Sequence, residues 1–191
     1  MLDLIKNRRS VRKYKKDNLP ESVLKQIVEA GRYAPSGGNS QTNHFIVIRN
    51  ESHLSHLKRL VREEFAKMEI DENTYKSIQN SVAQSKRGNY DFMYDAPVLI
   101  ILANKIGYPN GIADCGAALE NMMLAAKYFD VGSCWINQLH WLDHNSVIRQ
   151  YLYTLGLGDN ETVCGSLSLG YSNQQYSPPL ERTGNKVTYV D

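Results

Sequence analysis

Hydrophobic residues recur with helical spacing along much of the first half of the chain. Residues 2–8 predict a short helix, and residues 20–34 predict a firmer one, because their apolar positions share one face and Pro20 suits a first helical turn. Further amphipathic patterns predict a long helix over residues 54–68 and a weaker one over residues 74–86.

Strand-like patterns alternate with these helices. Residues 44–48 (HFIVI) and 133–136 predict short strands, and residues 162–171 predict a longer one. Residues 97–103 (PVLIILA) are almost entirely apolar, which is typical of a strand buried on both faces. Residues 186–190 (KVTYV) alternate like a strand but have no neighbouring strand in the sequence, so we expect them to pair with a distant strand or with another chain.

Two helices complete the predicted set. Residues 112–129 are the most apolar, and a helix that is apolar nearly all round is buried, either at the centre of a domain or in a subunit interface. Farther along, Asp143 is expected to cap a helix that carries apolar residues at 147–155 and that Gly156 or Gly158 closes.

The alternation of strands and helices predicts one layered α/β or α+β domain over residues 1–191. Hydrophobic residues make up 42% of the chain and charged residues 22%, which allows a sizeable core. The formal net charge of +2 gives no general attraction to nucleic acid or to a membrane surface. No apolar run approaches the roughly 20 residues that span a bilayer, and the N-terminus lacks a signal-peptide core. We therefore expect a cytoplasmic protein.

Arginines near the N-terminus are the first candidate for ligand binding. Arg8, Arg9, Ser10 and Arg12 lie within the segment NRRSVRKY. Guanidinium groups suit phosphate and carbonyl groups because they form paired hydrogen bonds. A solvated basic turn on the surface is the alternative interpretation.

Two further segments carry polar groups that could face a ligand. In residues 36–41 (SGGNSQ), two glycines let the backbone approach a ligand, and Asn39 and Gln41 each offer a donor and an acceptor to a flat heterocycle. A helix-ending loop is the alternative. In residues 132–138 (GSCWINQ), a strand end could present backbone N–H groups, and an ordinary strand with a core tryptophan is the alternative.

The sequence indicates neither a catalytic nucleophile nor a metal site. Cys134 has no basic partner nearby, which favours a buried structural cysteine. His140 and His144 have the spacing of a metal pair but lie on either side of the predicted cap Asp143, and no third ligand is indicated. Asp114, near the start of the apolar helix, is expected to be a structural cap.

The order of these segments resembles the FMN-dependent nitroreductase family in its short form. The resemblance rests on RRSVRKY, APSGGNSQ, DAPVLIIL, the run ADCGAALENMMLAAKYFDVGSCWI, and LGY followed by PPLERTGNKVTYV, and it spans nearly the whole chain. It implies the family's α+β fold, in which helices surround a mostly antiparallel central sheet. It also implies a domain-crossed homodimer with two FMN sites at the interface.

The resemblance assigns the first set of cofactor-binding residues position by position. Arg8 matches an arginine that binds the FMN phosphate. Arg9 and Ser10 match residues that contact the phosphate, the ribityl chain or the ring edge. Arg12 matches the basic residue that faces N1 and the C2 carbonyl, where a cation stabilises the negative charge of the reduced flavin.

A second set of residues is assigned in the same way. Three residues match those that reach the flavin from the second subunit: Ser36, Asn39 and Gln41. Asn137 lies where the family places a backbone N–H against flavin N5. Arg182 matches a basic residue of the tail that closes on the phosphate, and Lys186 is a second candidate. The strand predicted at 186–190 would extend the partner's sheet.

The implied activity is that of an FMN-dependent NAD(P)H oxidoreductase without a catalytic side chain. Hydride would pass from NAD(P)H to flavin N5 and then, in a ping-pong cycle, to a small acceptor such as a nitroaromatic compound or a quinone. One alternative is a specialised reductase of an enone, a halogenated ring or a flavin. Another is a flavin-binding or redox-sensing protein with little turnover. The small net charge opposes a nucleic-acid binder that uses the arginines.

The chain departs from the family pattern in two places. Thr42 and Asn43 stand where the family often has Pro-Trp, and the segment between the long helix and DAPVLIIL contains no motif that the resemblance assigns. That segment shapes the substrate channel in the family. The sequence therefore predicts neither the physiological acceptor nor a preference for NADH or NADPH.

Overall fold

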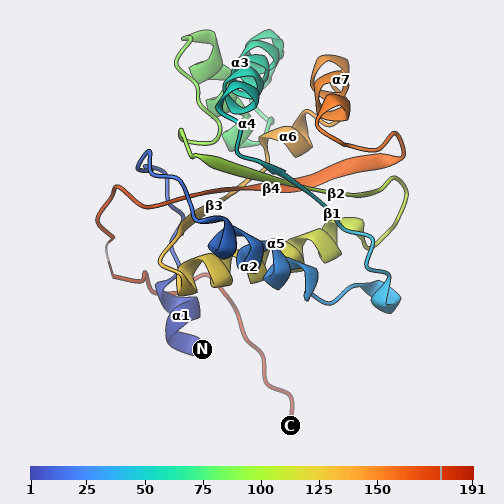
Figure 1. Ribbon diagram of the computed structural model, residues 1–191. Coiled ribbons are helices and arrows are strands. Elements are labelled where there is room, and N and C mark those ends of the chain that lie inside the picture. Colours follow the sequence, from blue (N-terminus) through green and yellow to red (C-terminus); the bar gives the residue numbers. More distant parts are fainter. Residues whose placement is uncertain (177) are drawn as a thin grey trace.

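A computed structural model describes residues 1–176 and 178–191, and its helices and strands alternate as predicted (Figure 1). The α-helices are α1 (Leu2–Asn7), α2 (Glu21–Arg32), α3 (Glu51–Lys67), α4 (Lys76–Lys86), α5 (Gly111–Tyr128), α6 (Gln138–Trp141) and α7 (Ser146–Thr154). The strands are β1 (His44–Ile48), β2 (Val98–Lys105), β3 (Gly132–Ile136) and β4 (Glu161–Gly170). None of these helices combines the length and hydropathy of a bilayer-spanning segment.

The strands form one sheet in the order β1-β2-β4-β3, and every neighbouring pair is antiparallel. Helices α2 and α5 lie on one face of this sheet, and α3, α4, α6 and α7 lie on the other (Figure 1). The arrangement confirms the expected α+β fold with a mostly antiparallel central sheet surrounded by helices.

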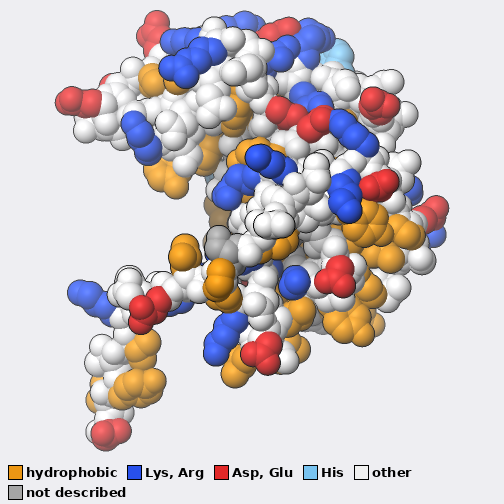
Figure 2. Space-filling model, turned by 90° about the vertical axis from the view of Figure 1, so that its left-hand side faces the viewer, with side chains coloured by type: hydrophobic (Ala, Val, Ile, Leu, Met, Phe, Trp, Pro, Cys, Tyr) orange, Lys and Arg blue, Asp and Glu red, His pale blue; other side chains and the backbone are white. Residues whose placement is uncertain are grey.

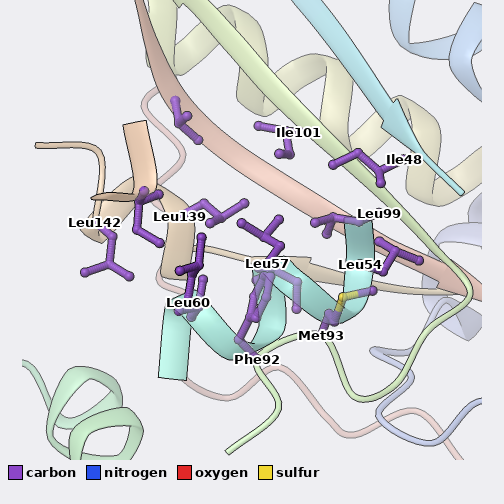
Figure 3. Close-up of a cluster of buried hydrophobic side chains, with 14 of the residues drawn as sticks. Ile48, Leu54, Leu57, Leu60, Phe92, Met93, Leu99, Ile101, Leu139 and Leu142 are labelled. Atoms are coloured by element: carbon purple, nitrogen blue, oxygen red, sulfur yellow. The ribbon is translucent and has the colours of Figure 1, made fainter. Parts of the chain in front are cut away.

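Strand β2 connects the two hydrophobic cores because its side chains alternate between the two faces of the sheet. One face contributes Leu99, Ile101 and Ala103 to the core beneath α3 and α7, part of which Figure 3 shows. The other face contributes Val98, Ile100 and Leu102 to the core against α2 and α5. This confirms that the apolar run at 97–103 is a strand buried on both faces.

Helix α5 is buried along its sheet-facing side. Its fully buried residues are Cys115, Ala118, Leu119, Met122 and Ala126. At Gly31 of α2, a Cβ atom would lie 2.8 Å from a side-chain carbon of Met122, so glycine allows the two helices to approach closely. The exposed Ile112 and Tyr128 at the two ends of α5 show that the burial is not complete.

The predicted cap of the last helix is wrong. The cap of α7 is Asn145, whose side chain accepts a hydrogen bond from the backbone N–H of Ile148 at 3.0 Å. Asp143 is only 4% exposed and accepts hydrogen bonds from Arg149, from the Thr162 hydroxyl and from the backbone N–H of residue 163. The carboxylate therefore ties α7 to the start of β4, a tertiary role that the capping pattern does not reveal.

The prediction is confirmed at one chain end beyond the sheet and not at the other. Helix α1 forms as predicted, whereas residues 186–190 form no strand with the described part of the chain. Instead, the C-terminal segment is exposed and extends away from the body of the protein (Figure 1). Its pairing with a second chain stays a prediction.

Candidate functional site

Five of the predicted binding residues meet in one cavity of about 280 Å³. The cavity lies between the segment that follows α1 and the segment that follows β4. Its lining residues are Arg8, Arg9, Ser10, Arg12, Gln174, Gln175, Tyr176 and Arg182. Four guanidinium groups around so small a space favour a polyanionic group as the occupant.

Backbone pairing holds the N-terminal segment in place. Ser10 forms a parallel bridge with Ser133 of β3, and the N–H of Val11 donates to the Ser133 carbonyl at 2.9 Å. Val11 is 2% exposed, so its side chain anchors the segment in the core. The backbone N–H of Arg12 donates to Gln174 Oε1 at 3.1 Å, which joins this segment to the tail.

Arg8 has a buried guanidinium nitrogen that no group in the described residues satisfies. Its Nε forms no hydrogen bond, and the nearest carboxylate, Glu120 Oε1, lies 3.6 Å away. A buried N–H group without an acceptor costs free energy, and hydrogen bonds to charged groups are among the stronger ones. Glu120 forms only a long ion pair with this group, so a ligand acceptor placed against Arg8 would satisfy its N–H.

Arg12 lies where this cavity meets a second one of about 610 Å³. Its guanidinium carbon is 5.9 Å from the centre of the Tyr94 ring. Burial acts to lower the pKa of Arg12, but Cys134 and Tyr94 raise it, and the net pKa lies above its ordinary value. Arg12 is therefore a permanent cation at the junction of the two cavities. Figure 2 shows one hollowed face of the molecule with the tail projecting below it.

The second cavity is lined mainly by neutral polar and aromatic side chains. Helix α4 presents polar residues at 77, 80, 81 and 84. The aromatic residues are Tyr75, Tyr90, Tyr94, Trp135 and Trp141. Flat rings and amide groups suit a planar ligand that has a few polar substituents.

A directed chain of hydrogen bonds links three walls of this cavity. Gln138 Nε2 can only donate, and it lies 2.7 Å from the Tyr90 hydroxyl. Tyr90 then donates to Ser81 Oγ at 2.7 Å, because Ser81 donates its own proton to the Ser77 carbonyl at 2.9 Å. Burial raises the pKa of Tyr90 to about 12, so the hydroxyl stays protonated near neutral pH.

The end of β3 brings Asn137 to the second cavity, which Arg12 also lines. Its side-chain oxygen accepts a hydrogen bond from the indole N–H of Trp135 at 2.7 Å, so the side chain is held back against the strand. Cys134 lies on the same strand and is 3% exposed, which confirms the prediction of a buried cysteine. Burial raises the pKa of its thiol, which opposes a role as a nucleophile.

Four predicted binding residues lie in neither cavity. Ser36, Asn39 and Gln41 belong to a loop whose Gly37 N–H donates to the carboxylate of Asp114 near the start of α5. Asp114 is thus not the predicted helix cap, because it anchors this loop instead. Lys186 lines neither cavity and belongs to the exposed tail.

Several lining residues were not predicted from the sequence. Gln174, Gln175 and Tyr176 complete the first cavity, and the α4 residues and Tyr90 form a wall of the second. The polar positions of α4 recur every three or four residues, so they share one helical face. This polar helical face was the one indication of these lining residues in the sequence, and any solvated helix shows the same pattern.

Comparisons with known proteins agree with this architecture. A family model described as the nitroreductase family matches residues 5–171. The crystal structure of a nitroreductase with bound FMN from Bacteroides fragilis is 35% identical, covers 100% of this chain and 98% of its own, and has a TM-score of 0.89.

Two curated relatives are more distant. A protein of Archaeoglobus fulgidus, provisionally named NADH dehydrogenase/NAD(P)H nitroreductase, is 29% identical over 91% of this chain and 86% of its own. A 4-nitrobenzoate reductase from a Nocardioides species is 26% identical over 91% of this chain and 81% of its own. With its antiparallel sheet, its helical layers and a family match over nearly its whole length, the chain belongs to the nitroreductase family.

Proposed function

We propose that the protein is an FMN-dependent NAD(P)H oxidoreductase that reduces small electrophilic acceptors such as nitroaromatic compounds and quinones. The observation that carries this proposal is the unsatisfied Nε of Arg8 in a cavity lined by four arginines, which opens through Arg12 into a larger neutral cavity. FMN matches these two cavities, because it has a charged phosphate at one end and a planar ring at the other.

The residues present fit FMN in charge and in shape. Arg8, Arg9, Ser10 and Arg182 would hold the phosphate end, since guanidinium and hydroxyl groups are strong phosphate donors. Arg12 would lie beside the ring, and Asn137 would offer its backbone N–H to the ring edge. When bound, FMN supplies the capacity to take up a hydride from NAD(P)H and to deliver it to an acceptor.

The protein's own residues would bind and orient FMN and the acceptor, and they would stabilise the charge of the reduced ring. The Arg12 cation would stabilise the negative charge that reduction leaves on the ring. The hydrogen bonds that join Gln138, Tyr90 and Ser81 would fix the wall of the cavity against which the acceptor lies. No side chain of the described residues is needed as a nucleophile, and solvent would supply the protons.

A homodimer is part of the proposal. Ser36, Asn39 and Gln41 line neither cavity of their own chain, so they would complete the site of a second copy. Lys186 and the strand predicted at 186–190 would likewise contact the partner. Support for this arrangement comes from the exposed course of the tail, whose Val187, Tyr189 and Val190 are large exposed hydrophobic residues.

The first test is a visible absorption spectrum of the purified protein before and after anaerobic addition of NADPH, and separately of NADH. Flavin bands that bleach would support the proposal and identify the donor. A protein that shows no flavin bands even after incubation with FMN would refute it. Turnover with a neutral quinone then separates a reductase from a flavin-binding protein, and parallel lines in double-reciprocal plots would indicate the ping-pong cycle.

A further inference from the structure

The backbone of the loop that carries Ser36, Asn39 and Gln41 has an unusual conformation. Gly38, Asn39 and Gln41 have φ angles of 58°, 54° and 51°, in the left-handed region. Residues other than glycine adopt this region at a free-energy cost, and they persist there when surrounding contacts hold them. The contacts that hold this loop are therefore of functional interest.

The first holding contact is a buried carboxylate. Asp114 is 6% exposed, and its two carboxylate oxygens lie 3.1 and 3.2 Å from the Gly37 backbone nitrogen. The Tyr108 hydroxyl lies 3.1 Å from Asp114 Oδ2, 3.2 Å from the Gly37 carbonyl and 3.2 Å from Ser40 Oγ. One carboxylate and one hydroxyl thus contact three polar groups at the middle of the loop.

The fit of the loop against this clamp is tight. A Cβ atom at position 37 would lie 2.7 Å from the Tyr108 oxygen, closer than real Cβ contacts come. A side chain at position 37 would force the ends of Tyr108 and Asn110 to shift, whereas the φ angle of Gly37 is not in the left-handed region. The loop is therefore packed closely against Tyr108 and Asn110, next to the start of α5.

The second holding contact explains a departure from the family pattern. Asn43, which stands where the family often has Trp, donates from Nδ2 to the Asp114 carbonyl at 3.2 Å. Its Oδ1 accepts from Asn104 Nδ2 at 2.8 Å and from Cys115 Sγ at 3.2 Å. Both ends of the loop are therefore fastened to the first turns of α5, and Asn43 is a half-buried polar link.

We propose that Asp114 and Tyr108 are positioning residues that hold Asn39 and Gln41 for contact with FMN bound by a second copy of the chain. The clamp engages the backbone and Ser40, and it leaves the side chains of Asn39 and Gln41 exposed. A loop held in a strained conformation with two amide side chains left exposed is suited to contact an external group. This inference rests on the proposed function.

The test measures FMN affinity by fluorescence quenching in Tyr108→Phe, Asp114→Asn and Asn39→Ala. We expect each to weaken FMN binding by roughly tenfold, the effect of one lost hydrogen bond. Tyr153→Phe is the matched control, since that hydroxyl bonds only Arg149 in the described residues and lies outside both cavities. If Tyr108→Phe binds FMN as tightly as the wild type, the inference is overturned.

A double-mutant cycle distinguishes a positioning role of Asp114 from a general loss of protein stability. If Asp114 acts through the loop, Asp114→Asn combined with Asn39→Ala should weaken FMN binding little more than either change alone. Additive effects would overturn the positioning role. If Asp114→Asn does not fold, the cycle is run with Tyr108→Phe, which removes a single oxygen atom.

Mixed dimers test whether the clamp acts on the partner's site. Subunits with Arg8→Ala and subunits with Asp114→Asn are given different tags and co-expressed, and the mixed species is isolated. If the loop serves the second copy, one site combines an intact Arg8 with an intact loop, and half of the tight FMN sites return. If the loop acts within its own chain, none return. A wild-type protein that binds no FMN would instead refute the proposed function.

Discussion

The two cavities that meet at Arg12 are built from different chemistry. The smaller one, of about 280 Å³, is lined by four arginines, three of which come from one short segment. Among the described residues that line the larger one, of about 610 Å³, Arg12 is the one basic residue, and the acidic residues Asp91 and Asp95 are both paired with Lys58. Charge should therefore govern binding in the first cavity, and shape and neutral hydrogen bonds should govern it in the second.

The largest expected effect comes from removing a charge in the smaller cavity. Arg8→Ala should weaken FMN binding by about 1.5–3 kcal/mol, which is roughly 10- to 150-fold in Kd. Titration with riboflavin, which lacks the phosphate, should show little change. Arg59→Ala is the control, because that arginine is exposed on α3 and pairs with Glu63. Equal losses for FMN and riboflavin would contradict a phosphate role.

A smaller effect is expected in the wall of the larger cavity. Tyr90→Phe removes the hydroxyl that joins Gln138 to Ser81, and a neutral hydrogen bond contributes less than a charged one. The kcat/KM for a neutral quinone should fall roughly 2- to 12-fold while FMN affinity stays unchanged. Steady-state kinetics and an FMN titration of the same preparation would check this. A parallel loss of FMN affinity would show that the two cavities are not independent.

A change in ionic strength should distinguish binding in the two cavities without any mutation. Raising the ionic strength from about 0.05 M to about 0.5 M screens charges, so FMN affinity should fall several-fold. The KM of a neutral quinone, measured with saturating FMN, should change much less. A KM that rises as steeply as the FMN Kd would show that charge also governs the larger cavity.

The smallest effect concerns pH. The pKa of Tyr90 is raised by burial from 10.0 to about 12, so turnover between pH 6 and 9 should show no titration of this group. Above pH 10 an unfolded chain would lose the Tyr90 proton before the folded protein does. Stability should therefore fall as the pH rises from 10 towards 12. Urea unfolding at pH 9 and pH 11 should show a smaller loss in Tyr90→Phe than in the wild type.

The same contrast explains what could be predicted from the sequence. The elements around the sheet followed from local hydrophobic patterns, and the arginines stood close together in a recognisable segment. Tyr90, Ser81 and Gln138 form one hydrogen-bonded chain, but each is an ordinary polar residue in its own segment. Their role arises from the packing of α4 near α6, which no local pattern records.

Local sequence patterns also predicted the wrong role for two carboxylates, because the same pattern suited more than one role. Asp143 and Asn145 are both good helix caps, and the choice between them depends on Arg149 and Thr162 in the folded protein. Asp114 posed the same problem, because a carboxylate near a helix start suits the helix dipole as well as it suits a bond to Gly37. In each case a contact between distant parts of the chain decided the role.

The position of β4 in the sheet has a consequence for biosynthesis. Strands β1 and β2 can pair as soon as both have left the ribosome, but β3 has its sheet neighbour only when residues 161–170 emerge. The segment after α1 can pair with β3 through Ser10 and Ser133, but its second bridge, from Tyr14 to Ser172, waits until residue 172 has emerged. The arginines are made first, but the cavity that they line is complete only after nearly the whole chain has been translated, because residues 174–176 and Arg182 also line it. A nascent chain stalled before residue 161 would lack the cavity, so loading of the cofactor would follow synthesis.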